Sequence, residues 1–119
     1  MKLEEAIFAK VAPWTDVVFD LEGVVVFKDK YPVTEGHWLF VPKEDSQDNI
    51  NRALTLAYDF GKRMVDDGEC DAYNVGMNCG ISAGQTVMYP HIHLIPRRRG
   101  DMADPAGGVR HVIPEKGKY

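Results

Sequence analysis

Two histidines near the C-terminal end of the sequence, His91 and His93, have the type and spacing that point most directly to chemistry. The apolar residues around them predict a β-strand over residues 86–95. Side chains alternate along a strand, so two imidazoles at positions i and i+2 project from the same face. The alternation predicts two sets: Val87 and Tyr89 beside the histidines, and Met88, Ile92 and Leu94 in the core.

Three interpretations of this histidine pair follow from the residues. Paired histidines on a strand are a common zinc arrangement, but Cys70, Cys79, His37 and His111 supply no standard ligand spacing. A structural pair held by hydrogen bonds is the second interpretation. The third is nucleophilic or acid–base catalysis, because imidazoles titrate near neutral pH and a loop that can hold an anion lies next to them.

That loop precedes the histidine strand and contains several glycines. Gly80 and Gly84 permit positive φ angles and a close approach of the backbone to a ligand. Asn78, Gln85 and Thr86 add neutral hydrogen-bonding groups, and the whole set suits phosphate oxygens. The loop lacks the lysine of a P-loop, so a Walker-type NTPase is excluded.

The charge distribution favours a small anionic ligand over a nucleic acid or a membrane surface. The chain of 119 residues has 14 basic and 18 acidic residues, a net charge of −4, which argues against general nucleic-acid binding. Residues 91–119 nevertheless carry six basic and three acidic residues, a balance of +3, and three of the four histidines. A bound anion and a solvated basic tail both agree with that local balance.

The cysteines and the apolar runs predict a cytoplasmic protein. Cys70 and Cys79 form no CxxC pair, as expected of reduced thiols rather than of a disulfide framework. The first residues lack the apolar core of a signal peptide, and no apolar run approaches the roughly 18 residues of a membrane helix.

The remaining periodicity predicts one α+β domain over residues 1–119, with a mostly antiparallel five-stranded sheet. Apolar spacing indicates a short N-terminal helix that ends at Pro13, and a long helix from Ser46 to Val65. One helix covers one sheet face, so we expect the other face to meet solvent, the tail or a second subunit. Pro90 indicates that the histidine strand lies at an edge or that the backbone nitrogen of Pro90 faces outward. The predicted strands span residues 17–20, 24–27, 37–41, 72–77 and 86–95.

Three sequence elements together resemble the histidine triad (HIT) superfamily, over about Ile7 to Arg97. They are Gly36-His37 followed by Leu39-Phe40-Val41-Pro42-Lys43, then Asn78-x-Gly80-x-x-Ala83-Gly84-Gln85-Thr86-Val87, then His91-Ile92-His93-Leu94-Ile95-Pro96-Arg97. The Ala-Gly-Gln-Thr-Val element and the Leu-Ile-Pro-Arg-Arg-x-Gly-Asp ending are most similar to the fragile histidine triad and dinucleoside polyphosphate hydrolase branch.

The resemblance implies a HIT fold, a homodimer whose sheets join edge to edge, and a nucleotide whose α-phosphate lies at the histidine strand. It implies that His91 is the nucleophile that forms a nucleotidyl-histidine intermediate, and that His93 contacts the phosphate oxygens. The supporting residues that it implies are His37 behind the pair, Asp29 at the ribose hydroxyls, and Asn78, Gln85 and Thr86 on the phosphate side.

One position departs from the superfamily pattern, because Tyr89 stands where the first histidine of the triad is usual. A tyrosine keeps a hydrogen bond but hardly shares a proton near pH 7. We therefore expect the nucleophile to survive and the rate and pH dependence to change. The resemblance then predicts cleavage of a dinucleoside polyphosphate such as diadenosine tetraphosphate at the α-phosphate. An adenosine phosphoramidase and a nucleotide-binding protein without catalysis are the alternatives.

The tail over residues 97–119 is rich in glycine and proline and is predicted to be a loop. Its Arg110 or Lys116 is a candidate for contacting the distal phosphates, whereas we expect Arg97–Arg99 to be solvated. The chemistry requires no cofactor and no metal, although Mg²⁺ can accompany a polyphosphate substrate. We expect a small nucleotide as the partner, and neither a nucleic acid nor a membrane.

Overall fold

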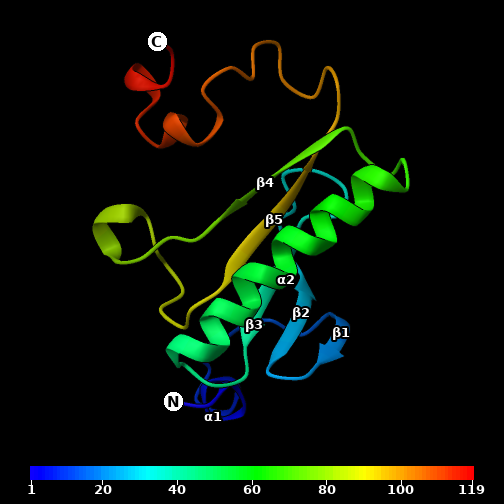
Figure 1. Cartoon of the computed structure of the whole chain (residues 1–119). Coiled ribbons are helices and arrows are strands. Elements are labelled where there is room, and N and C mark those ends of the chain that lie inside the picture. Colours follow the sequence, from blue (N-terminus) through cyan, green and yellow to red (C-terminus); the bar gives the residue numbers. More distant parts are fainter.

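The computed structural model describes residues 1–119 and contains a five-stranded antiparallel sheet with a long helix across one face (Figure 1). The strand order is β1-β2-β3-β5-β4, which confirms the predicted fold class. None of the helices combines the length and apolar character that a membrane crossing needs. The helices and strands are α1 (Leu3–Phe8), β1 (Val17–Leu21), β2 (Val24–Lys28), β3 (Trp38–Pro42), α2 (Gln47–Asp66), β4 (Ala72–Gly76) and β5 (Ile92–Arg97). Three short 3₁₀ helices are η1 (Ile81–Ala83), η2 (Gly108–Val112) and η3 (Pro114–Lys116).

Strand β2 is buried on both sides because both faces of the central sheet are covered. Val24 and Val26 belong to a hydrophobic cluster with α2, whereas Val25 and Phe27 belong to a second cluster on the opposite face. A continuous apolar run is the sequence pattern of such a fully buried strand. The hairpin from β1 turns at Gly23, whose φ of 76° lies in the left-handed region that glycine adopts readily.

The long helix α2 approaches the sheet through small residues. Ser46 caps the helix, since its hydroxyl accepts the Asn49 amide hydrogen at 3.3 Å. Ala53, Ala57 and Gly61 lie on the buried side of the helix, which packs against β3, β4 and β5. The helix predicted from Ser46 onward is therefore confirmed.

The N-terminal segment covers part of the other sheet face. The helix α1 ends at Phe8, earlier than the predicted stop at Pro13. The chain continues with Ala12 and Trp14, which are both buried in the second hydrophobic cluster. The expectation that only solvent, the tail or a second subunit would meet this face was wrong, because a short segment with spaced apolar residues can cover a sheet without a long helix.

The histidine strand begins later than predicted. β5 starts at Ile92, since Pro90 has no amide hydrogen to donate to a neighbouring strand. The residue before Pro90, Tyr89, is buried in the second cluster and is 3% exposed, whereas Met88 is 51% exposed. The prediction that Met88 belongs to the core was therefore wrong. Of the two alternatives for Pro90, the edge position was wrong, because β5 lies between β3 and β4 and Pro90 precedes the strand.

The segment after β5 is tied to the sheet by an arginine that we expected to be solvated. Arg97 donates to both carboxylate oxygens of Asp101 at 2.8 and 2.9 Å, and to Asn74 of β4 at 2.8 Å. A planar guanidinium can bind several acceptors at once, which explains the difference from the prediction. Beyond this anchor the chain forms η2 and η3, and η2 lies beside β4.

Candidate active site

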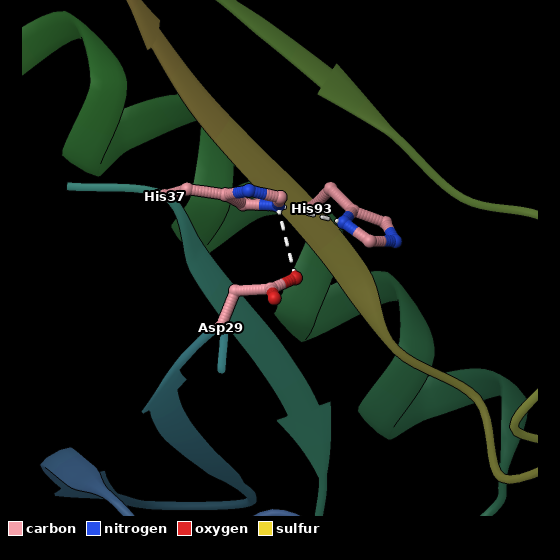
Figure 2. A group of neighbouring side chains, drawn as sticks. All are labelled: Asp29, His37 and His93. Carbon is pink, nitrogen blue, oxygen red and sulfur yellow. Dashed lines mark hydrogen bonds and ion pairs between the residues drawn. The ribbon is translucent and has the colours of Figure 1, made fainter. Parts of the chain in front are cut away.

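Three histidines and one aspartate meet at one end of the central strands. Asp29 follows β2 and His37 precedes β3, while the register of β3 and β5 pairs Leu39 with His93. Figure 2 shows the side chains of Asp29, His37 and His93 pointing toward one another. The ring of His91 lies 5.2 Å from that of His93, centroid to centroid. The fold thus brings together the predicted nucleophile and three of its predicted supporting residues.

The ring of His91 is oriented by its own backbone. Its Nδ1 lies 2.8 Å from the carbonyl oxygen of Tyr89. A carbonyl can only accept a hydrogen bond, so Nδ1 carries the proton and Nε2 of the neutral ring keeps a lone pair. His91 is half-buried, and its free nitrogen has the electronic state that a nucleophile needs.

The position of the proton on His37 is set by the hydrogen bond at its Nδ1. The amide of Val33 donates to His37 Nδ1 at 3.1 Å, so the proton of a neutral His37 is on Nε2. That Nε2 lies 2.9 Å from His93 Nδ1 and therefore donates to it. His93 accepts at Nδ1 and carries its own proton on Nε2. The two neighbouring histidines of the strand consequently have opposite tautomers.

His93 is uncharged at neutral pH. Its pKa is lowered to about 4, chiefly by burial and also by the nearby His91 and His37, while Asp29 acts in the opposite direction. Burial also lowers the pKa of His37, against the opposing effect of Asp29. The site therefore offers a lone pair on His91 beside a neutral N–H donor on His93, a combination suited to attack on phosphorus.

The phenol of Tyr89 hydrogen-bonds to the main chain and not to a histidine. Its hydroxyl donates to the Pro42 carbonyl at 2.6 Å, and burial raises the pKa of Tyr89 to about 12. The phenol stays protonated and does not share a proton with His91 near neutral pH. The hydrogen bond between the two residues joins the backbone carbonyl of Tyr89 to the His91 ring.

The glycine loop is shaped by Gln85. Its side-chain oxygen accepts the Gly80 amide hydrogen at 2.8 Å, and its side-chain nitrogen donates to the Val87 carbonyl at 3.1 Å. The side chain of Gln85 thus links Gly80 at one end of the loop to Val87 at the other. Asn78 and Thr86 are exposed, so their polar groups face solvent and are accessible to a ligand.

The tail residues predicted to contact distal phosphates, Arg110 and Lys116, are joined to each other and not to the histidines. Arg110 donates to the Lys116 carbonyl at 2.9 Å, and its guanidinium lies 4.7 Å from the centroid of the Tyr119 ring. Both residues are exposed. Within one chain, the tail therefore forms its own local structure beside β4, and Arg110 and Lys116 are not brought to His91.

Comparison with known proteins assigns the chain to a family. The HIT domain family matches residues 13–100. The chain belongs to the HIT family. A HIT-like protein of Saccharolobus solfataricus is 33% identical over 87 residues, covering 67% of this chain and 63% of that protein. Adenosine 5′-monophosphoramidase of Saccharomyces cerevisiae is 40% identical over 75 residues, covering 60% of this chain and 48% of that enzyme.

A solved HIT structure agrees with the fold. The zinc-bound histidine triad family protein from Mycobacterium smegmatis has a TM-score of 0.69 and 27% sequence identity, covering 83% of this chain and 76% of that one. The predicted superfamily is confirmed, and the narrower branch stays a prediction. This HIT chain spans less than two thirds of the length of either sequence relative.

Trp14 is a residue of the HIT site that sequence reasoning missed. Its ring lies 4.8 Å from that of His91 and 6.0 Å from that of Phe27, centroid to centroid. Trp14 and Phe27 also line a cavity of about 750 Å³ between α1 and the first two strands. The aromatic type of Trp14 was the only available signal, because it lies in no helix or strand and its contact with His91 is remote in sequence.

The donor atoms of Asp29, His37 and His93 lie within 4.8 Å of one another, close enough to consider a metal ion. A cation would need the lone pair of His37 Nε2, but that nitrogen carries the proton because Nδ1 accepts from Val33. Metal binding to this group would therefore require a proton to be lost and the hydrogen bond to His93 to be broken. The donor set fits a hydrogen-bonded network better than a zinc site.

Proposed function

We propose that this HIT protein is a nucleotide hydrolase or transferase that cleaves a dinucleoside polyphosphate at the α-phosphate. The reaction would pass through a nucleotidyl-histidine intermediate on His91. The observation that carries this proposal is the 2.8 Å hydrogen bond from His91 Nδ1 to the Tyr89 carbonyl. That bond keeps Nε2 unprotonated and holds the ring in one orientation, which favours attack on an electrophilic phosphorus.

The reaction consists of two displacements at the same phosphorus. In the first, His91 Nε2 forms a bond to the α-phosphorus while the bond to the bridging oxygen breaks, and the leaving nucleotide departs with that oxygen. In the second, water attacks, the P–N bond breaks, its electron pair returns to Nε2, and the proton of the water is released. The hydrogen bond from Nδ1 to the Tyr89 carbonyl stabilises the positive ring of the intermediate.

The surrounding residues have roles that their chemistry supports. We assign the Nε2–H of His93 to a non-bridging phosphoryl oxygen, where it stabilises developing negative charge. Asn78 and Thr86 contact other phosphate oxygens, and Asp29 contacts the ribose. Arg110 and Lys116 would reach distal phosphates only from the tail of a second chain in a homodimer. No metal is needed for these steps, and Mg²⁺ would accompany the polyphosphate as part of the substrate.

Adenosine phosphoramidase activity is the second candidate, and the similarity to the yeast 5′-monophosphoramidase favours it. The same lone pair on His91 would attack the α-phosphorus, with an amine as the leaving group. A nucleotide-binding protein without catalysis is the third candidate, suggested by Tyr89 in the first triad place. Side-by-side kinetics on diadenosine tetraphosphate and an adenosine phosphoramidate separate the first two candidates.

Substitution of His91 tests the proposal. We expect His91→Ala to reduce turnover at least about 10³-fold, because the nucleophile is removed. Mass spectrometry of the wild type during turnover should show a nucleotide adduct on His91. His111→Ala is the control, since His111 lies in the tail and contacts the Ala106 carbonyl. Full turnover by His91→Ala would contradict the mechanism, and nucleotide binding without product or adduct would favour the third candidate.

A further inference from the structure

Asp29 makes contacts that binding to a sugar does not require. One carboxylate oxygen accepts the Tyr31 amide hydrogen at 2.8 Å. The other lies 3.3 Å from His37 Nε2, and the Asp29 side chain is 17% exposed. The carboxylate is therefore oriented toward the histidines by the protein itself, as Figure 2 shows.

We infer that Asp29 is a positioning residue for the reaction, which acts through His37 to keep the proton of His93 on Nε2. This inference rests on the proposed function, because His93 needs that proton only if it donates to a phosphoryl oxygen. It adds a second role to the ribose contact that the family resemblance implies for Asp29. The two roles are compatible, since each carboxylate oxygen has more than one lone pair.

The proton on His37 Nε2 lies between two acceptors. His93 Nδ1 is 2.9 Å away and Asp29 Oδ2 is 3.3 Å away. In the opposite arrangement, His93 Nδ1–H would donate to a lone pair on His37 Nε2. That lone pair would face the Asp29 carboxylate, and the proton moved to His37 Nδ1 would face the Val33 amide hydrogen. Asp29 and Val33 thus select the same tautomer from the two sides of the ring.

The selected tautomer determines what His93 presents to a ligand. With Nδ1 accepting from His37, Nε2 carries a hydrogen and can donate to a phosphoryl oxygen. With the opposite tautomer, Nε2 would present a lone pair and repel that oxygen. The titratable groups that act on His93 are His91, His37 and Asp29, and Asp29 is the only carboxylate among them. Asp29, in the connection between β2 and β3, therefore controls the tautomer of His93 on β5.

Asp29→Asn and Asp29→Ala test this role. An amide accepts through one atom only, so asparagine cannot serve both the Tyr31 amide and His37 Nε2–H. The spectroscopic readout is the ¹⁵N chemical shifts of His93 in the protein without nucleotide. We expect the wild type to show a protonated Nε2 and an unprotonated Nδ1, and both variants to show a mixture of tautomers. Asp59→Asn, an exposed substitution on α2, should leave the shifts unchanged.

Kinetics separate the positioning role from the sugar contact. The variants are assayed with diadenosine tetraphosphate and with an analogue that lacks the 2′- and 3′-hydroxyls. We expect kcat to fall about tenfold with both substrates, the effect of one hydrogen bond to a charged group. A residue that only binds ribose would lose its effect with the analogue. Circular dichroism confirms that each variant is folded, and the asparagine variant preserves the side-chain volume.

Two results would overturn the inference. One is an Asp29 effect that disappears with the analogue while the His93 shifts stay as in the wild type. The other is a wild-type His93 whose proton is on Nδ1. Failure of the proposed function is distinguishable, because it would appear as absent turnover by the wild type, whereas the tautomer of His93 is measured without substrate.

Discussion

His91 and His93 are two residues apart, yet the groups that hydrogen-bond to their Nδ1 atoms differ in kind. The Nδ1 of His91 donates a hydrogen bond to a backbone carbonyl, whereas the Nδ1 of His93 accepts a hydrogen bond from the N–H of His37. The hydrogen bond of His91 is made by the backbone of Tyr89 and not by its phenol. This explains why tyrosine at the first triad place leaves the orientation of the proposed nucleophile intact.

The lowered pKa of His93 predicts a loss of stability in mild acid. A histidine in an unfolded chain has a pKa near 6.5, whereas the pKa of folded His93 is about 4. Between these values the unfolded chain binds more protons, so the free energy of unfolding falls as the pH decreases from about 6.5 to 4. The contribution of His93 is on the order of 3 kcal/mol.

Urea unfolding of the wild type and of His93→Gln over this pH range measures the effect. The variant should depend less on pH, although the similarly directed shift of His37 leaves part of the slope. Equal pH slopes for both proteins would show that His93 has an ordinary pKa in the folded state.

At the scale of secondary structure, the contact between α2 and β4 depends on the absence of a side chain. A Cβ on Gly61 would overlap the ring of Tyr73. Gly61 lies on the buried side of α2, and only the packed structure shows which aromatic ring occupies the space above it. The position of α2 in turn sets how Ile92 and Leu94 of the histidine strand are covered.

Gly61→Ala should therefore destabilise the protein even though alanine is the better helix former. Helix propensity favours alanine by about 1 kcal/mol, whereas overpacking costs about 1–3 kcal/mol. We expect a net loss of up to about 2 kcal/mol in chemical denaturation. Thr55→Ala, at an exposed position of α2, is the control and should not destabilise. A gain of stability in Gly61→Ala would mean that the Tyr73 ring moves aside freely. If the ring stays in place, the double variant Gly61→Ala/Tyr73→Val should be more stable than Gly61→Ala.

At the scale of the whole molecule, the sheet has two edges, β1 and β4. The pairing of β1 with β2 is irregular between Val17 and Phe19, and such irregularities make an edge less suitable for adding another strand. The register of β4 with β5 has no such shift. If the proposed homodimer joins sheets edge to edge, β4 is the better edge.

We predict that the protein sediments with twice the 13.4 kDa mass of the chain. Ala72→Lys on β4 should shift the equilibrium toward the monomer, because a two-fold interface brings equivalent charges close together. Val17→Lys on β1 is the matched control and should leave the dimer intact, since both residues are exposed in one chain. Analytical ultracentrifugation measures both variants, and a monomeric wild type would contradict the proposed assembly.

The family and the role of His91 as nucleophile came from the resemblance of three motifs. Local patterns in the sequence were sufficient for the strands at residues 17–20 and 24–27 and for the helix that begins near Ser46. These features depend on residues that are close together in the chain, so alternation and spacing report them directly. The same reasoning began the last strand too early, because Pro90 has no amide hydrogen for strand pairing. It also missed the burial of Tyr89, which depends on the N-terminal segment and on the Pro42 carbonyl.

The features of the site that the sequence patterns did not predict depend on contacts between segments remote in the chain. The packing of Trp14 on His91, and the hydrogen bonds that join Asp29, His37 and His93, arise only when β2, β3 and β5 pair in one antiparallel register. Residue types can therefore predict that imidazoles act on a phosphate. The nitrogen that carries each proton depends on which donor or acceptor folding brings to it, and no local period encodes that neighbour.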